Sequence, residues 1–558
     1  MSSITQPLLK LDIFKTPTEA LTSEDQVATA YLRARTIARS YRLTAEDILH
    51  LTPKFWDMHR DPIGAFDFAA HTLLTIQYNL VAGTLAPFLK DRPDLSGVMD
   101  RILYFDISAQ FLLTEVGHGL DARNLETTAT LLPSGEFELL TPCRRAAKYM
   151  PPTSPQPGFP RIGIVMARLI MDGQDKGIRA FLVWLNDGQQ MCKGVSAKAL
   201  PHRTGCKPLD HSITSFNRVR IPGSALLGPL PKQTDAKADF HSTIWRVHVG
   251  TLALSTTLIP MLKRGVYVAG KYSLRRHVTG PDGQPSPIIS FRTQQRPLLR
   301  GIAQTVVFDA FAQASIKLFV DKEIDDRVRH GVAAAFKAVL AQATQSTLFA
   351  LAERCGAQGL FRYNSIIESQ LEARGISIAE GDTLVLSIRL ATELLLDRYS
   401  MPAPADPSCL LARYERGIFA FCQKTLFSLC SGRHRSEEFN THVLPHCQTL
   451  VEAIGHRMAY EAAREARVDE DHLALYQSAV LLQAPALYIQ ESGLKGDIWS
   501  EFEKEALALD RLLPKLDALL EETGAGPYCT AAIVSDGDWD FFVDGLQGFR
   551  GEGSQSRL

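Results

Sequence analysis

Three short segments of this 558-residue chain contain residue types that could bind a cofactor or move a proton. They are residues 113–119 (LTEVGHG) with 124–129 (NLETTA), residues 272–276 (YSLRR) with 291–295 (FRTQQ), and residues 355–359 (CGAQG) with 380–383 (EGDT). Together they offer hydroxyl and carboxylate groups, guanidinium charge, and glycines at which a backbone can approach a ligand closely. Binding of a phosphate-bearing cofactor and a proton-transfer step both need groups of these kinds.

Glu380 is the residue of this set that is best placed to accept a proton. It comes just before a predicted helix, which Asp382 or Thr383 would cap. A carboxylate that takes a proton from carbon must be held close to it and be partly desolvated, so that its pKa rises toward the working pH. The alternative interpretation is a surface glutamate near a helix start, where the helix dipole favours negative charge.

Arg276, Gly356 and Gly359 are the residues that could hold a phosphate group. A guanidinium pairs well with a pyrophosphate, and a backbone without side chains can approach it. Without further context, a surface arginine on a helix is the preferred interpretation of Arg276. A simple helix C-cap is the alternative for the two glycines.

The chain that must position these segments divides into four regions by its sequence pattern. We expect helices, a small β domain, a helical bundle and a further helical region, over residues 1–105, 106–232, 233–400 and 401–558. The fold class predicted is therefore α+β and mainly helical. A proline-rich hinge at 401–407 separates the last two regions.

The second and third regions have the clearest periodicity. Short apolar runs bounded by glycine and proline turns predict strands near residues 163–171, 178–185 and 213–221. In the third region, apolar residues spaced by four, three and four predict one buried face of a helix over 307–318.

Composition excludes several classes of function. Lys and Arg number 60 against 61 Asp and Glu, so the formal net charge of −1 gives little support to nucleic-acid binding. The nine cysteines form no CxxC pair, which predicts a reducing compartment. The sequence has no stretch of about 18 apolar residues, so no membrane span is predicted.

Two polar clusters offer weaker signals. His434, His442 and His446 lie near Cys447, but their spacing fits no common zinc pattern, and we predict a solvated stretch and no metal site. The basic run at residues 144–148 is consistent with a solvated turn or with contact to an anionic cofactor.

The chain ends in Ser556-Arg557-Leu558, a variant of the Ser-Lys-Leu tripeptide that the peroxisomal import receptor binds. The preceding residues are rich in glycine and serine, which predicts an accessible tail. We therefore expect a peroxisomal protein, with a chance polar terminus as the alternative.

In this order, the three segments resemble the acyl-CoA oxidase branch of the acyl-CoA dehydrogenase superfamily of flavoenzymes. The first is similar to the family's TE-x-GHG…LETTA signature, and the second to a helix pair that carries an Arg and a Gln. The third is similar to the CGGHG…EGEN pair, and its separation of 25 residues (380 − 355) is that of acyl-CoA oxidases. The similarity covers roughly residues 60–400.

The resemblance implies FAD as the cofactor and assigns residues to it. Glu380 corresponds to the catalytic base, and Gly381 to a substrate-binding position. Arg276 and Gln295 correspond to residues that reach the FAD of a neighbouring subunit, so a homodimer at least is implied. The flavin contacts implied are Thr114, Gly117, Met150, Pro152, Thr153, Arg276, Gln295, Gly356, Gly359 and Asp382.

The reaction implied is α,β-dehydrogenation of an acyl-CoA or related acyl thioester. Glu380 would take the α-proton while the β-hydrogen leaves as hydride to the flavin, and O₂ would reoxidise the flavin with release of H₂O₂. One alternative is a flavin-dependent desaturase or dehydrogenase of specialised metabolism that acts on an atypical acyl group. Another is a catalytically silent partner subunit.

One stretch departs from the family pattern. Where oxidases carry Lys-Trp-Trp-Pro-Gly-Gly along the flavin, this chain has residues 148–153 (KYMPPT). Pro152 has no N–H to donate, so either Thr153 takes over the contact or the site is reshaped, with Met150 in place of an aromatic wall. Arg292 and Thr383 also replace the usual Gln and Asn. These changes affect the substrate assignment more than the fold.

Overall fold

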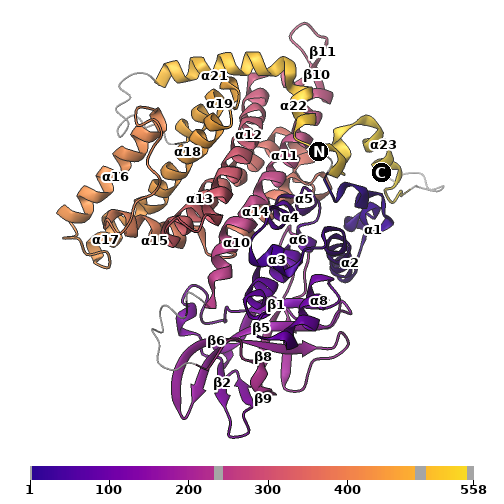
Figure 1. The fold of residues 1–558 in the computed structure, drawn as a ribbon. Coiled ribbons are helices and arrows are strands. Elements are labelled where there is room, and N and C mark those ends of the chain that lie inside the picture. The colour runs from indigo at the N-terminus through magenta and orange to yellow at the C-terminus, as the bar shows by residue number, and fades with distance from the viewer. Residues whose placement is uncertain (1–2, 231–239, 241–242, 484–497, 550–558) are drawn as a thin grey trace, which may run out of the picture.

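The structure is a computed structural model that describes residues 3–230, 240, 243–483 and 498–549. Its N-terminal region is helical, as predicted, and packs against one end of a larger helical bundle (Figure 1). A buried ion pair between Arg33 and Asp67 (2.8 Å) joins two of its helices. The α-helices are α1 (Asp12–Lys15), α2 (Ser23–Tyr41), α3 (Ala45–Leu49), α4 (Pro53–Arg60), α5 (Ile63–Phe66), α6 (Phe68–Thr75), α7 (Gly83–Leu85) and α8 (Ser96–Leu103), and the π-helical turn η3 (Ile76–Ala82) follows α6.

The β region contains two sheets. One has the order β1-β5-β2-β3-β9, with β6 paired to β5, and the other has the order β4-β8-β7. The predicted runs at 163–171 and 178–185 are β5 and β6, whereas the run at 213–221 divides into β8 and β9. The strands are β1 (Ser108–Leu112), β2 (Thr128–Leu131), β3 (Phe137–Leu140), β4 (Lys148–Pro152), β5 (Arg161–Met171), β6 (Gln174–Asn186), β7 (Val195–Ala199), β8 (His211–Phe216) and β9 (Val219–Ile221).

The bundle that follows contains the two longest helices of the described chain, α12 and α13, lying side by side (Figure 1). The helix predicted over 307–318 lies inside α12. A small hairpin of β10 (His277–Thr279) and β11 (Pro285–Pro287) connects α11 to α12 and projects from the bundle. The helices are α10 (Trp245–Thr256), α11 (Leu258–Arg275), α12 (Arg292–Val320), α13 (Asp326–Arg354), α14 (Ile366–Ile378) and α15 (Thr383–Leu395).

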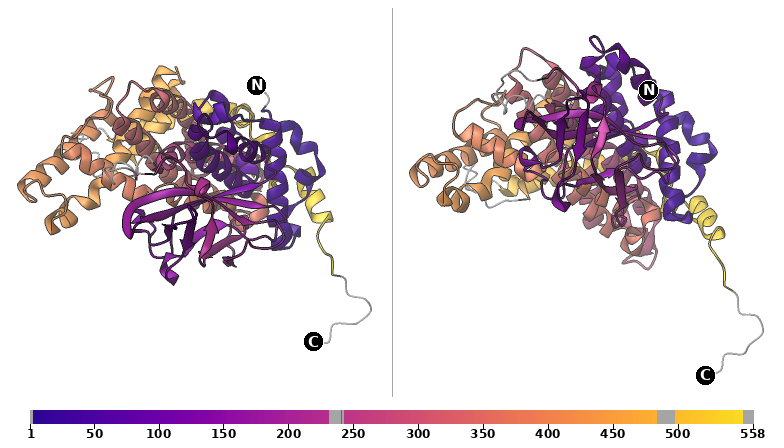
Figure 2. Two further views of the ribbon diagram at one scale, coloured as in Figure 1. Left: turned by 60° about the horizontal axis from the view of Figure 1, so that its bottom comes forward. Right: turned by 90° about the horizontal axis from the view of Figure 1, so that it is seen from below.

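The last region begins after the proline-rich hinge and extends across the bundle. Helices α16 and α17 lie on the opposite side of the bundle from the N-terminal helices (Figure 2). Helix α22 contacts α11, and the Tyr528 hydroxyl lies 2.9 Å from that of Thr5, so this region returns to the N-terminus. The helices are α16 (Leu410–Ser428), α17 (Glu437–His442), α18 (Cys447–Glu465), α19 (Glu470–Leu481), α21 (Ile498–Leu512), α22 (Leu516–Glu522) and α23 (Asp536–Asp544).

The buried apolar side chains form two clusters. One runs continuously through the N-terminal helices, the bundle and the C-terminal helices, and the other lies within the β region. No helix in the described ranges is long and apolar enough to cross a bilayer. The same residues contain no cluster of three or more His, Cys, Asp or Glu side chains that could hold a metal ion.

Two buried carboxylates on α14 connect the β region to the bundle through hydrogen bonds and ion pairs. Glu372 accepts a hydrogen bond from the backbone N–H of Lys207 (2.9 Å). Glu368 pairs with the Lys207 ammonium (3.3 Å) and with Arg362 (2.5 Å). Because α14 ends just before Glu380, this joint fixes that residue relative to the β region.

We predict that Glu368→Gln lowers the free energy of unfolding by about 3–5 kcal/mol, because two cations lose their buried carboxylate partner. Burial opposes ionisation of Glu368, but the charges of Lys207, Arg264 and Arg362 outweigh it and lower its pKa. The stabilising charge is therefore present at neutral pH, and the difference from the wild type should shrink as the carboxylate is protonated in acid. Urea unfolding at several pH values measures both effects.

The matched control is Glu353→Gln, which removes an exposed carboxylate paired with Arg354 on α13. An exposed ion pair contributes about 0–1 kcal/mol, so this variant should unfold nearly as the wild type does. Equal effects of the two substitutions would contradict the role assigned to Glu368.

Candidate active site

Glu380 occupies a tight turn between α14 and α15, directly before a helix as predicted. The turn places Glu380 at φ +54° and Gly381 at φ +94°. Asp382 caps α15 by accepting a hydrogen bond from the backbone N–H of Val385 (3.1 Å), which confirms that prediction. A positive φ is disfavoured for a residue with a Cβ, and such residues cluster at functional sites.

The carboxylate of Glu380 lies in a recess formed by two other elements. Its Oε2 atom accepts a hydrogen bond from Asn79 Nδ2 (3.1 Å), and Asn79 comes from the π-helical turn η3. On α10, a Cβ added to Gly250 would lie 1.0 Å from the same oxygen. Glycine at position 250 therefore leaves the space that the carboxylate fills.

Two buried cations face Glu380. Lys337 is on α13, and Arg246 is on α10, where its Nε donates to the backbone oxygen of Asn79 (2.7 Å). Burial raises the pKa of Glu380 to about 8, although Lys337, Arg246 and the Asn79 amide all favour the ionised form. A carboxylate with this pKa can both take and release a proton near neutral pH, as a general base requires.

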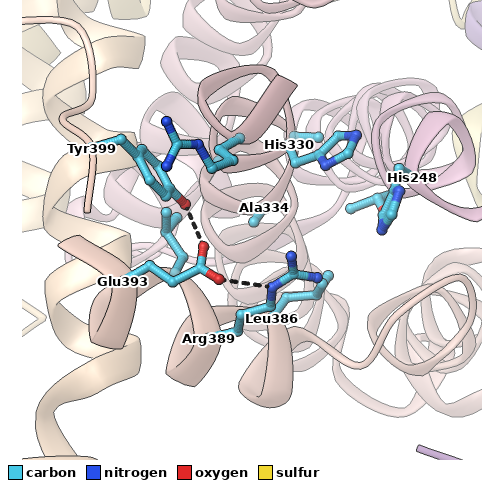
Figure 3. Close-up of a pocket in the computed structure, with 12 residues that line it drawn as sticks. His248, His330, Ala334, Leu386, Arg389, Glu393 and Tyr399 are labelled. Atoms are coloured by element: carbon cyan, nitrogen blue, oxygen red, sulfur yellow. Dashed lines mark hydrogen bonds and ion pairs between the residues drawn. The ribbon is translucent and has the colours of Figure 1, made fainter. Parts of the chain in front are cut away.

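A pocket lies next to this turn, between α10, α13 and α15 (Figure 3). The rings of His248 and His330 face one another there, with 4.0 Å between their centroids. Glu393 accepts hydrogen bonds from Tyr399 (2.9 Å) and Arg389 (3.3 Å). The lining therefore combines charges of both signs with apolar side chains such as Leu386 and Leu390.

In the β region, Glu115 connects residues 113–119 to residues 124–129 by hydrogen bonds. Its buried carboxylate accepts hydrogen bonds from the backbone N–H groups of Glu126 (2.7 Å) and Thr127 (2.9 Å). Lys148 is also buried and pairs with Glu115 (3.0 Å). Of the basic run at 144–148, Lys148 is thus internal, and burial lowers its pKa to about 8.

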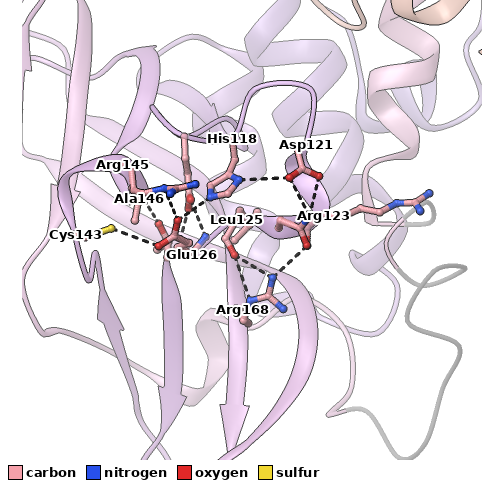
Figure 4. Close-up of polar contacts among 12 residues, drawn as sticks. His118, Asp121, Arg123, Leu125, Glu126, Cys143, Arg145, Ala146 and Arg168 are labelled. Carbon is pink, nitrogen blue, oxygen red and sulfur yellow. Dashed lines mark hydrogen bonds and ion pairs between the residues drawn. The ribbon is translucent and has the colours of Figure 1, made fainter. Parts of the chain in front are cut away.

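A second layer of contacts is centred on Glu126 (Figure 4). Its Oε1 atom lies 2.8 Å from His118 Nε2 and 2.8 Å from Arg145 Nε. Gly117 packs against the same arginine, because its N–H donates to the Arg145 carbonyl (2.7 Å) and an added Cβ would lie 2.9 Å from the Arg145 side chain. Local packing therefore requires the glycine at position 117, whereas a Cβ added to Gly119 would meet no atom within 4 Å.

The strand β4 and its neighbours present free polar groups where the resemblance places the flavin. The half-buried Thr114 hydroxyl makes no hydrogen bond with any described residue, and its carbonyl accepts from Tyr149 (2.9 Å). The carbonyl of the half-buried Met150 accepts from His211 Nδ1 (2.8 Å). The other ring nitrogen of His211 is buried without a partner in the described chain. These groups fit a cofactor that offers both donors and acceptors.

Pro152 and Thr153 are buried at the end of β4, which is an edge strand of its sheet. Pro152 is buried opposite His211 in the β4–β8 ladder and offers no N–H. The Thr153 hydroxyl is buried 2.7 Å from that of Thr214. That hydroxyl is thus already engaged, and the assignment of both residues to the flavin remains a prediction.

Arg276 and Gln295 lie near the C-terminal end of α13, whereas Glu380 lies beside its middle. Arg276 directly follows α11 and is exposed, and its guanidinium makes no hydrogen bond or ion pair with the described residues. Gln295 is buried, and its amide donates to the carbonyl of Ile289 (2.9 Å). The adjacent Gln294 donates to the carbonyl of Arg354 (3.0 Å), so the ends of α11, α12 and α13 meet here.

The two glycines that follow α13 have different local reasons to be glycine. Gly356 has φ +58° and open space around it, so its backbone is accessible. Gly359 is buried, and an added Cβ would lie 1.9 Å from the carbonyl oxygen of Ala352. The C-cap interpretation therefore describes Gly356, and close packing describes Gly359; neither observation tests contact with FAD.

The predicted site residues thus fall into two groups that are far apart. Lys337, beside Glu380, and Arg354, beside Gly356, are both on α13 and 17 residues apart (354 − 337). At 1.5 Å per residue this is about 25 Å along the helix. Glu380 and Arg276 therefore lie in different places on the subunit.

Several residues of the site were not identified from the sequence. A glycine inside a helix is unfavourable, so Gly250 within α10 was a usable signal. Asn79, Arg246, Thr251 and Lys337 carry no local signal, because they come from separate elements that meet only in the folded chain.

Comparisons with known proteins give a consistent result. Residues 247–395, which include Gly250, Lys337 and Glu380, match the acyl-CoA oxidase C-alpha1 domain. The chain is 26% identical over 383 residues to peroxisomal acyl-coenzyme A oxidase 2 of Arabidopsis thaliana, covering 64% of this chain and 54% of that one. It is 25% identical to human peroxisomal acyl-coenzyme A oxidase 3, covering 53% and 46%. The chain spans about half the length of these relatives.

Solved structures share the fold over almost the whole chain. Acyl-CoA oxidase 3 from Yarrowia lipolytica superposes with a TM-score of 0.82 at 18% identity, covering 97% of this chain and 87% of that one. Acyl-CoA oxidase-1 of Caenorhabditis elegans, solved with FAD and ATP, gives 0.78 at 18% identity, covering 97% and 89%. The predicted fold class and the resemblance to the acyl-CoA oxidase branch are confirmed.

We predict that Glu380→Gln stabilises the folded chain, with a gain that grows from about pH 5 to pH 8. The pKa of Glu380 rises from 4.5 to about 8 on folding. The folded wild type therefore binds more protons than the unfolded chain in this window and loses stability as pH rises, by at most about 1.4 kcal/mol per pH unit. Thermal unfolding of both proteins across this range measures the trend. A difference that is independent of pH would contradict the raised pKa.

Proposed function

We propose that this chain, which resembles acyl-CoA oxidases in its motifs, its matched domain and its fold, is an FAD-dependent oxidase of acyl thioesters. The reaction proposed is α,β-dehydrogenation to the trans-2-enoyl thioester. The observation that carries the proposal is the Glu380 carboxylate, which is held by Asn79 and faces Gly250, with its pKa raised to about 8.

Glu380 is proposed to take the proton from the carbon next to the thioester carbonyl. Its raised pKa makes proton abstraction more favourable than it would be for an exposed glutamate. The backbone N–H of Glu380 makes no hydrogen bond in the described part of the chain, so it is available to the thioester oxygen, as the resemblance implies. Gly381 is proposed to contact the substrate beside it.

Two groups of residues are proposed to hold FAD. Thr114 and Met150 would line the flavin ring, where His211 adds a buried ring nitrogen without a described partner. Arg276 and Gly356, at the other end of α13, would bind the FAD of a neighbouring subunit. Bound FAD would supply a two-electron acceptor for the substrate's hydride, and passage of both electrons to O₂ together with two protons would give H₂O₂. The separation of about 25 Å along α13 between Lys337, beside Glu380, and Arg354, beside Gly356, supports a homodimer at least.

Pro152 favours a second candidate function. A buried strand without N–H donors at that position offers the flavin fewer backbone contacts than the family pattern does. We therefore retain a flavin-dependent desaturase or dehydrogenase of specialised metabolism, and a silent partner subunit, as alternatives. A colourless purified protein would favour the silent subunit. A yellow protein that acyl thioesters bleach, but that air reoxidises slowly, would favour the dehydrogenase.

Location in peroxisomes is part of the proposal. Relatives from Arabidopsis thaliana and Homo sapiens are named as peroxisomal enzymes, which supports it. The tripeptide Ser556-Arg557-Leu558 lies outside the described residues, and its recognition by the import receptor remains a prediction.

We predict that Glu380→Gln slows reduction of the flavin by an acyl thioester about 10²–10⁴-fold. The substitution keeps size and hydrogen-bonding capacity, so folding and flavin content should be retained. Anaerobic stopped-flow absorbance with a panel of acyl-CoA thioesters measures the rate, and it also reports the preferred acyl group. Bleaching at the wild-type rate would mean that the base lies elsewhere.

We further predict that Gly250→Ala slows the same step about 10²-fold, because the new methyl group takes the place of Glu380 Oε2 and displaces the carboxylate. The control is Gly97→Ala in α8, where an added Cβ meets no atom within 4 Å. That variant should keep the wild-type rate and gain about 0.4–1 kcal/mol of stability. Equal rates in the two variants would contradict the position assigned to the carboxylate.

A further inference from the structure

The turn that carries Glu380 is held by side chains at three consecutive carbonyl groups. Thr251 on α10 donates its hydroxyl to the carbonyl of Glu380 (2.8 Å). Lys337 on α13 donates to the carbonyls of Ala379 (2.5 Å) and Gly381 (2.6 Å), on either side of Glu380. Two helices of the bundle therefore donate hydrogen bonds to the backbone of one short turn.

Lys337 is an unusual residue to find in such a position. Its side chain is almost completely buried, at 1% exposure, within an apolar stretch of α13. Taking an ammonium group out of water is costly unless it is well hydrogen-bonded. Its hydrogen bonds go to the two carbonyls that flank Glu380, so the cost is offset at this turn.

We propose that Lys337 is the positioning residue of the active site: its buried ammonium, together with the Thr251 hydroxyl, locks the turn so that Glu380 presents its carboxylate and its backbone N–H in one fixed geometry. This inference rests on the proposed function of Glu380 as the base. It assigns a role to Lys337 and Thr251, which lie outside the three sequence motifs.

The backbone geometry supports this role. Glu380 has φ +54° and Gly381 has φ +94°, and the first value is disfavoured for a residue with a side chain. Because the carbonyls of residues 379–381 all bind the bundle, the peptide planes of the turn are fixed. The Glu380 N–H, which has no partner in the described chain, is fixed with them.

The charge of Lys337 acts on the same carboxylate. The groups that act on Glu380 are Lys337 from α13, Arg246 from α10 and Asn79 from η3. Asp382, from the same turn, acts on Lys337. Lys337 is the first of the favourable influences on the Glu380 carboxylate, and burial lowers its own pKa to about 8. Removing Lys337 should therefore destabilise the ionised form of Glu380 and also destabilise the turn.

The test compares Lys337→Met, which keeps the length and apolar volume of the side chain, with Lys317→Met, which removes an exposed lysine of α12. In anaerobic stopped-flow with an acyl-CoA that reduces the wild type, Lys337→Met should lower the limiting rate about 10²-fold. The pH at which the rate is half-maximal should rise by about 1–3 pH units, because an opposite charge near the carboxylate is lost. Binding of the thioester should change far less, and Lys317→Met should behave as the wild type.

A second pair of variants separates the hydrogen bond from general packing. Thr251→Val removes the hydroxyl at nearly constant volume, and Thr251→Ser keeps it. We expect a slower limiting rate in Thr251→Val and recovery in Thr251→Ser. If Thr251 served packing alone, the valine variant would be the less affected of the two.

A measurement without turnover distinguishes failure of this inference from failure of the proposed function. The difference in melting temperature between the wild type and Glu380→Gln is measured against pH, and the same comparison is repeated in chains that carry Lys337→Met. Lys337→Met should move the Glu380 titration to higher pH. An unmoved titration, or an unchanged pH profile of flavin reduction, would overturn the role of Lys337. A wild type that no acyl thioester bleaches would instead overturn the proposed function, and the titration would still decide on Lys337.

Discussion

Burial of one carboxylate is the constraint on which the arrangement of this site depends. An ionised Glu380 can be placed between helices only if other groups compensate for the lost hydration of its charge, and the neighbouring elements supply such groups. The π-helical turn η3 gives the Asn79 amide, α10 gives the empty space at Gly250 and the charge of Arg246, and α13 gives Lys337. The net result remains a raised pKa, because these contributions only partly offset burial.

The β region is positioned relative to that carboxylate by the same helix that leads into it. Glu368 and Glu372 on α14 bind Lys207 of the β region, and α14 ends at the Glu380 turn. The residues of the β region that are proposed to contact substrate and flavin are therefore connected to the proposed base through a short, polar and buried set of contacts. A rigid link of this kind suits the proposed reaction, in which a proton and a hydride leave neighbouring carbon atoms.

Helix α13 connects the two ends of the molecule that the motifs identify. Its middle carries Lys337 at the Glu380 turn, and its C-terminus leads into Gly356 near Arg276 and Gln295. A rise of about 25 Å separates these places, so the proposed base and the proposed cofactor contacts of Arg276 and Gln295 lie far apart on one subunit. The exposed guanidinium of Arg276 is consistent with a partner outside this chain.

The sequence by itself determined the fold class, the strands β5 and β6, and the helix after Glu380 with a cap at Asp382 or Thr383, because periodicity, turn residues and caps are local signals. The structure decided for Asp382. The sequence also determined Glu380 as the candidate base, through the order of three motifs. Only the tertiary structure revealed Asn79, Thr251 and Lys337, since these residues are far from Glu380 in the chain and lie on other helices. It also gave local reasons for Gly117 and Gly359, which clash with their own chain if a Cβ is added. Pairings of this kind depend on how elements pack, and packing is not encoded in any one segment.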